Sequence, residues 1–282
     1  MKTQTVAAGS TIADVARAIL LSDDHELPVL PDVAVQLLKL TGDVNCELKD
    51  IVDLFKRDQS LTGHLLKIAN SARYSSGQTV MSVQQAVARL GLLRVREVVM
   101  LISCQSRVFN VAGFEQDVRE SFERSLATAA FAQEIARVRR LNVEDAFLCG
   151  LLHDIGRPML LQALSDHRGS ADHGVSDDEI RGTAERLRVA MAGKLIRSWE
   201  LPARLECVIQ HQVNPEDAAE FEQATAILNL AIDIATLALT EDADVPKQIS
   251  HPMVGVLNLY PEDLASILHQ QTAILEWVRS TV

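Results

Sequence analysis

The chain has 282 residues, enough for one large domain or two modest ones that each bury a core. Hydrophobic residues make up 48% and charged residues 23% of the sequence, which is typical of a globular protein and excludes a disordered one. The formal net charge of −11 makes nucleic acid an unexpected partner, because phosphate binding requires cations. Two arginine clusters have acids nearby, so we predict solvated helix faces at Arg94 and Arg96 and at Arg137, Arg139 and Arg140.

The sequence shows no feature of secretion or of a membrane span. The N-terminus has no long apolar run. The most apolar stretch, residues 227–239, is interrupted by Asn229 and Asp233 and is too short to cross a bilayer. The four cysteines are scattered without a CxxC pair, which favours buried reduced thiols. We therefore expect a cytoplasmic protein that does not bind membranes.

Helical periodicity runs through the N-terminal part of the chain. Apolar residues repeat at a helical period over 48–55, and Asp58 is the predicted N-cap of a helix that carries Leu61. Ser82 and Gln85 have the spacing of a capping box, which opens a short helix that we expect to stop at Gly91. A further apolar helix follows over 92–102. Because no alternating stretch of convincing length appears, the sequence predicts an all-α fold.

Three polar or irregular segments predict breaks between helices, at 109–117, 165–178 and 240–252. The first has few periodic apolar positions, and we expect a boundary between two lobes there. The sequence thus predicts an N-terminal helix or extension at 1–20, a helical lobe at 21–115 and a second, HD-like helical lobe at 116–282. A groove between the lobes would be a natural place for a ligand or a partner.

Helical spacing in the second lobe places one carboxylate inside the protein. In the predicted helix 143–154, Phe147, Gly150, Leu151 and Asp154 share one stripe, and Gly156 and Pro158 are expected to end the helix. A buried carboxylate needs a cation or hydrogen-bond donors. Arg124, in the predicted helix 121–136, is a candidate for that cation, and backbone amides are the alternative.

Several short motifs in the first lobe occur in an order typical of one family. They are LPVLP at 27–31, a DQSL turn at Asp58 to Leu61, NSA at 70–72 and AVARLG at 86–91, ending in Leu90 and Gly91. The chain resembles the HDOD family on these motifs, although the family's turn has Pro where this chain has Gln59. Asn70 and Ser71 end a helix, so capping alone explains them, with a role in a partner surface as the alternative.

The resemblance continues over 116–240, where GLLHDIGRPML at 150–160 is similar to the His-Asp motif of HD phosphohydrolases. It implies a two-lobed HDOD-type fold whose C-terminal lobe is a degenerate HD-phosphohydrolase-like domain. In HD enzymes the metal also needs an upstream His and a downstream Asp, which align here with Arg124 and Ile232. Asp233 is adjacent, but one residue turns it about 100° off the shared face. A histidine pair of the family appears as His211-Gln212, with one His retained.

Arginine cannot ligate a metal, so we expect no metal, no cofactor and no catalytic residue. The resemblance implies a vestigial pocket made of Arg124, His153, Asp154 and His211. Asp177, Asp178 and Glu179 form an acidic cluster that fits a helix start better than a metal site.

Four functions remain open from the sequence. The resemblance implies a bacterial regulatory protein that binds signalling proteins, and a metal-dependent phosphohydrolase is the alternative. A third hypothesis is that the protein binds a nucleotide second messenger whose phosphate contacts Arg119, Arg124 or another arginine. A scaffold with a groove near 109–117 is the fourth, and a homo-oligomer stays open in each.

Overall fold

A computed structural model describes residues 11–22, 35–37, 40, 47–55, 57–71, 74, 77–107, 111–170, 175–240 and 251–281. Within these ranges every regular element is a helix, which confirms the all-α class. The elements are α1 (Ile12–Leu21), α3 (Leu48–Phe55), α4 (Gln59–Ala69), α5 (Val83–Arg107), α6 (Glu115–Val138), α7 (Val143–Leu152), α8 (Gly156–Ser170), α9 (Asp177–Ser198), α10 (Ala203–Gln210), η1 (Pro215–Phe221), α11 (Glu222–Leu239), α13 (Pro252–Val256), α14 (Pro261–His269) and α15 (Gln271–Thr281). The LPVLP motif at 27–31 and Ala72 lie outside the described residues, as do 108–110, 171–174 and 241–250 within the three predicted breaks.

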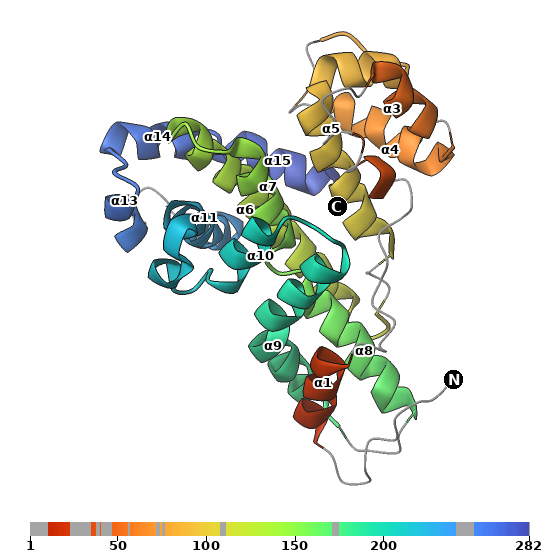
Figure 1. Ribbon diagram of the computed structural model, residues 1–282, viewed down its shortest axis with the longest axis vertical. Helices are drawn as coiled ribbons and strands as arrows, with labels where there is room; N and C mark the ends of the chain where they lie inside the picture. The colour runs from red at the N-terminus through yellow and green to blue at the C-terminus, as the bar shows by residue number, and fades with distance from the viewer. Residues whose placement is uncertain are drawn as a thin grey trace.

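Helices α3, α4 and α5 pack on one another as the N-terminal lobe, at the upper right of Figure 1. Asp58 is the N-cap of α4, as predicted, because its side chain accepts a hydrogen bond from the Leu61 amide at 2.9 Å. The helix that follows breaks at Gly91, where φ is +75° and ψ is 162°. Residues with a Cβ rarely adopt this conformation, which explains why the break falls on a glycine.

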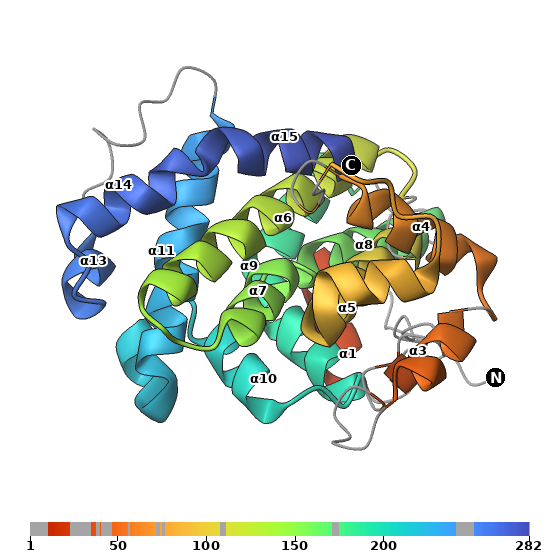
Figure 2. The ribbon, with the colours of Figure 1, turned by 90° about the horizontal axis from the view of Figure 1, so that it is seen from above.

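Helix α6 is the central element of the second lobe (Figure 2). It packs against α7, α8, α11, α14 and α15, and its residues from Ser125 to Gln133 are all buried. Four of these nine residues are alanine, which lets neighbouring helices approach closely from several sides. The core of the molecule therefore surrounds α6, and residues on its N-terminal half can reach the turn between α7 and α8.

Helix α1 lies against α8 and α9 of the second lobe, away from α3–α5 (Figure 1). Lys194 on α9 fixes its C-terminal end, donating to the carbonyl oxygens of Ile19 at 2.8 Å and Leu20 at 3.0 Å and to that of Ser22. A cation at this position satisfies carbonyls that have no partner within the helix and complements its dipole. The N-terminal helix thus packs with the lobe that is farther along the chain.

The two lobes meet where α5 packs on α7. Arg96 Nη1 lies 2.7 Å from Glu144 Oε1, and buried Glu97 accepts a hydrogen bond from Gln133 on α6 at 3.0 Å. Arg94 pairs with Glu97 at 2.7 Å. The prediction that Arg94 and Arg96 lie on a solvated face was wrong, because both pair with acids at this interface.

The helix predicted over 143–154 ends two residues earlier, at Leu152, and residues 153–155 form a turn. Gly156 and Pro158, predicted to terminate that helix, instead lie in the first turn of α8. Pro is tolerated there because the first amides of a helix have no partner. A Cβ on Gly156 would lie 2.0 Å from the Arg188 carbonyl oxygen, so glycine lets α8 start directly against α9.

Two further segments differ from the sequence-based expectations. Helix α8 extends to Ser170, so the first part of the loop predicted at 165–178 is helical instead. The stretch Pro215–Leu239 is long and apolar enough, by length and composition alone, to cross a membrane. Half of its most apolar window is buried, and α11 packs against α6, α7 and α10, as a core helix of a globular domain does.

Candidate functional site: a buried His-Asp pair with two arginines

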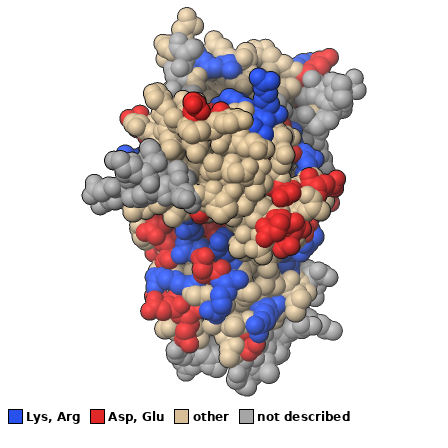
Figure 3. Space-filling view, turned by 90° about the vertical axis from the view of Figure 1, so that its left-hand side faces the viewer, with Lys and Arg blue, Asp and Glu red and all other residues tan. Residues whose placement is uncertain are grey.

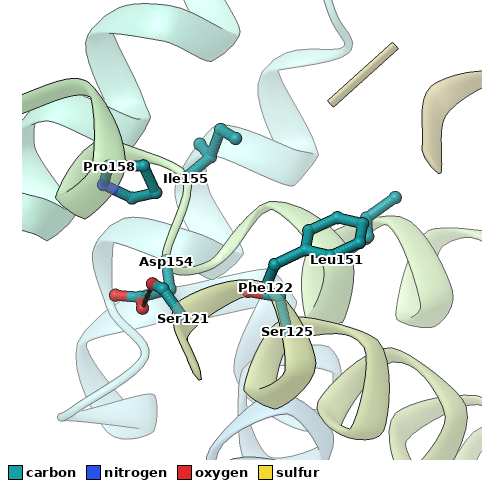
Figure 4. Close-up of a pocket in the computed structure, with 7 residues that line it drawn as sticks. All are labelled: Ser121, Phe122, Ser125, Leu151, Asp154, Ile155 and Pro158. Carbon is teal, nitrogen blue, oxygen red and sulfur yellow. Dashed lines mark hydrogen bonds between the residues drawn. The ribbon is translucent and has the colours of Figure 1, made fainter. Parts of the chain in front are cut away.

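His153 and Asp154 lie in the turn between α7 and α8, and both are 1% exposed. Asp154 points towards α6, where the Ser121 hydroxyl donates a short hydrogen bond to its Oδ2 atom (Figure 4). The inward direction of this carboxylate agrees with the expectation from helical spacing. The turn is fixed on the other side by the contact between Gly156 and the backbone of α9.

Two arginines from separate helices neutralise Asp154. Arg124 on α6 places Nη2 at 2.6 Å from Oδ2, and Arg188 on α9 places Nη1 at 3.4 Å from Oδ1. The Asp154 side chain is fully buried, while the side chains of Arg124 and Arg188 are 30% and 20% exposed. The structure thus forms the ion pair expected with Arg124 and adds a second cation. The positive charge that a buried carboxylate needs comes from these two guanidinium groups.

The protonation states of the pair follow from burial and from these charges. Burial on its own raises the pKa of Asp154, but the electrostatic effects of His153, Arg124 and Arg188 outweigh it and lower this pKa below its usual value. Burial lowers the pKa of His153 to about 4, so the imidazole is neutral at pH 7. Its Nδ1 atom lies 2.7 Å from the Gly150 carbonyl oxygen, which can only accept, so Nδ1 carries the proton.

The contacts of His211 lie at the end of α10. This residue ends the helix, and its Nδ1 atom lies 2.8 Å from the Cys207 carbonyl oxygen. The next residue, Gln212, is 2% exposed and donates to the His153 carbonyl oxygen at 3.3 Å. Asn229 on α11 in turn donates to the Gln212 carbonyl oxygen at 2.6 Å. Gln212 therefore contacts the backbone of the His-Asp turn.

The position of the absent downstream ligand is apolar. Ile232 packs against the hydrophobic core. Asp233, one residue later, has a side chain that is 58% exposed and lies 3.1 Å from His251 Nε2. This agrees with the expectation that Asp233 points away from the shared face.

The residues around Asp154 do not fit a metal ion. Among the described residues, no three His, Cys, Asp or Glu side chains gather in a group that could hold one. The cavity beside Asp154 has a volume of about 10 Å³, roughly the space of one water. Its lining residues are Ser121, Phe122, Ser125, Leu151, Asp154, Ile155 and Pro158 (Figure 4).

Further ion pairs join the helices around this pocket. Asp117 on α6 binds Arg157 at 3.1 Å and Arg181 at 3.0 Å, which links α6 to α8 and α9. Arg119, a predicted phosphate contact, pairs with Glu123 at 3.1 Å. At the level of α8 and α9, acidic and basic side chains alternate over the face in Figure 3, with a less charged band above them. The acidic residues 177–179 form the first turn of α9, directly after the N-cap Ser176, as expected for a helix start.

The motif residues of the first lobe have structural contacts. The Asn70 side chain donates to the Val80 carbonyl oxygen at 2.8 Å and accepts from the Val80 amide at 2.7 Å, which ties the end of α4 to the segment before α5. The Ser71 hydroxyl donates to the Ile68 carbonyl oxygen at 2.7 Å. Leu61 and Leu90 belong to the hydrophobic core. Asn70 therefore does more than cap α4, because its side chain also fixes the backbone at Val80, ten residues away.

Sequence reasoning missed three residues that contact the His-Asp turn: Ser121, Arg188 and Gln212. Ser121 lies three residues before Arg124, so helical spacing could have placed it on the same face. Gln212 could have been found as the residue after the retained His211. Arg188 carries no local signal, because only the packing of α9 on α8 brings it to Asp154.

Comparison with known proteins supports the family resemblance. A protein of Treponema pallidum (strain Nichols) that is named uncharacterized is 25% identical over 274 residues, which are 93% of this chain and half of that protein's length. An HDOD domain protein of unknown function from Geobacter sulfurreducens has a TM-score of 0.73 at 22% identity, covering 96% of this chain and 98% of its own.

A Shewanella amazonensis SB2B protein, named provisionally as a metal-dependent phosphohydrolase, has a TM-score of 0.73 at 19% identity, covering 95% of this chain and 98% of its own. At these identities the two solved structures show the fold alone. The family model of the HDOD domain matches residues 27–215, about two thirds of the sequence and both lobes. The chain therefore belongs to the HDOD family.

Proposed function

We propose that this protein is a non-catalytic regulator in bacterial signal transduction that acts by binding a protein partner. The observation that carries the proposal is the state of Asp154. Its charge is neutralised by Arg124 and Arg188 in a cavity of about 10 Å³. A metal ion would need that negative charge for itself, and a phosphate ester would need more space.

The proposal gives the His-Asp pair a mechanical role. Asp154 joins α6 and α9 through its two arginines, and His153 joins the same turn to Gly150 on α7 and, through Gln212, to the end of α10. Four helices are thus fixed around one turn. A stable arrangement of this kind supports a surface of constant shape, which suits a protein that presents contacts to a partner.

Purification of partners tests whether the protein acts by binding another protein, and the turnover assay described below tests whether it is non-catalytic. Tagged full-length protein is purified from its bacterial host, candidate partners are identified, and each is reconstituted with purified protein to measure stoichiometry and Kd. We expect a saturable complex that Asp154→Asn weakens through loss of fold rather than of a contact. If no purified candidate binds saturably, the partner half is wrong.

The alternative function is an HD-type phosphohydrolase, favoured by the His-Asp pair itself and by the name given to the Shewanella amazonensis protein. It requires turnover of a phosphodiester that His153→Ala and Asp154→Ala both abolish. Turnover by the wild-type chain in the presence of Mn²⁺, Mg²⁺ or Fe²⁺, lost in both variants, would replace our proposal with this one.

A further inference from the structure

A second cavity, of about 370 Å³, lies between the two lobes, at α4 and α15. Figures 1 and 2 both show the C-terminal end of α15 beside the N-terminal lobe. This volume is within the range of small-molecule sites, in contrast to the space beside Asp154. The cavity is lined by His64, Lys67, Ile68 and Ser71 of the α4 segment and by Glu276, Trp277, Ser280 and Thr281 of α15.

Each wall of this cavity is one face of a helix with an apolar base. Positions 64, 67, 68 and 71 follow the i, i+3, i+4, i+7 spacing of a single stripe. Ile68 is 6% exposed and Trp277 is 2% exposed, so both belong to the packed base of the cavity rather than to its rim. An apolar group of a ligand would rest on this base.

Opposite charges face one another across the cavity. Lys67 on α4 and Glu276 on α15 both line it, and both side chains are exposed. Within the described part of the chain, neither of these two side chains makes a hydrogen bond or an ion pair. Both are therefore available to a ligand. A ligand with a negative group at one end and a positive group at the other would satisfy both charges at once.

The hydroxyl groups of the cavity favour a ligand group that donates hydrogen bonds near α15. The Ser280 hydroxyl donates to the Trp277 carbonyl oxygen at 2.8 Å, and the Ser71 hydroxyl donates to that of Ile68 at 2.7 Å. Because their protons are used, these oxygens can offer only lone pairs to the cavity. An ammonium group beside Glu276 and Ser280 would meet acceptors on both, whereas a phosphate there would be repelled.

From this geometry we propose that the cavity binds a free α-amino acid with an apolar side chain. The carboxylate pairs with Lys67, the ammonium group pairs with Glu276, and the side chain rests on the apolar base at Ile68 and Trp277. Such a ligand connects the N-terminal lobe to α15, which packs on α6, the helix that carries Arg124. The protein would then sense an amino acid through the relative position of its lobes, a role that does not depend on any catalytic or partner-binding property of the His-Asp turn.

Calorimetry and thermal unfolding of the full chain test this site with L-leucine, L-phenylalanine and L-tryptophan as probes. N-Acetyl-L-phenylalanine lacks the ammonium charge, and L-phenylalaninamide lacks the carboxylate. We expect at least one free amino acid to bind saturably and to raise Tm by several degrees at about 100-fold its Kd. Each single-charge derivative should bind about tenfold more weakly or worse.

Two variants with matched controls locate the binding. Lys67→Met and Glu276→Gln change exposed side chains and should fold normally while weakening the amino acid by about tenfold or more. The same changes at exposed positions away from the cavity, Lys49→Met on α3 and Glu262→Gln on α14, should leave the Kd unchanged. The proposal is overturned if no free amino acid saturates the protein, if the derivatives bind equally well, or if the cavity variants bind like the controls.

Discussion

Replacement of Asp154 by Asn tests whether this residue belongs to an ion-pair cluster that stabilises the fold. The amide keeps the size of the side chain and can still accept from Ser121, but it removes the negative charge between Arg124 and Arg188. The two guanidinium groups, 30% and 20% exposed, are then left partly buried beside each other without a counter-charge. The change therefore alters electrostatics with little change in packing.

The magnitude follows from the burial of the pair. Two charges 4 Å apart near a protein surface interact with about 4 kcal/mol, and removing one partner of a buried pair typically costs about 3–5 kcal/mol. The free energy of unfolding should fall by about 3 kcal/mol or more, because the Asp154 side chain is 0% exposed. For a chain of this size that corresponds to a decrease in Tm of roughly 6–12 °C.

Urea unfolding followed by circular dichroism measures the change, with Asp178→Asn as the matched control. Asp178 also pairs with an arginine of α9, Arg181, at 3.3 Å, but its side chain is 94% exposed. Its replacement should cost less than about 0.5 kcal/mol. If Asp154→Asn is as stable as this control, the cluster does not stabilise the fold and our reasoning about the pocket fails.

Three further predictions concern the same chain. His153 has a folded pKa of about 4 against about 6.5 unfolded, so the unfolded chain binds its proton first as pH falls, and stability is lost from about pH 6.5 down to pH 4. His153→Asn, which keeps a donor for Gly150, should remove up to about 3 kcal/mol of that pH dependence in parallel denaturant titrations, and an unchanged pH profile would contradict it. Gly91→Ala should destabilise the fold by about 1–3 kcal/mol because φ is positive there. Gly63→Ala within α4, where an added Cβ meets nothing within 4 Å, should be neutral or stabilising. Equal effects of the two changes in thermal unfolding would refute the argument from the backbone conformation of Gly91. Lys194→Met should speed amide hydrogen exchange across 12–21 at least tenfold relative to α14, and unchanged protection would show that the carbonyl contacts do not hold α1.

Local signals in the sequence predicted the local structure well. The N-cap at Asp58, the break at Gly91 and the helix start at residues 177–179 depend on hydrogen bonds and backbone angles within a few residues. The inward direction of Asp154 followed from helical spacing in the same way. These features need no knowledge of the rest of the chain.

Several features that sequence reasoning missed are made by packing between distant segments. Arg188 reaches Asp154 from 34 residues along the chain because α9 packs on α8, and Lys194 caps a helix about 170 residues away. Arg96 was expected in solvent because acids lie near it in the sequence, yet it pairs with Glu144 of the other lobe. At the end of α10 the residue that contacts the His-Asp turn is Gln212, one residue after His211.

A manganese titration is the measurement that tests the central claim, that arginines rather than a metal neutralise the His-Asp pair. Purified full-length protein is titrated with Mn²⁺ by calorimetry, and its metal content and hydrolysis of bis(p-nitrophenyl) phosphate are measured in the same preparation. The ion pairs of Arg124 and Arg188 predict no saturable binding, far less than one ion per chain and no hydrolysis above the Asp154→Asn variant. One tightly bound ion per chain, with turnover that Asp154→Asn abolishes, would contradict the claim.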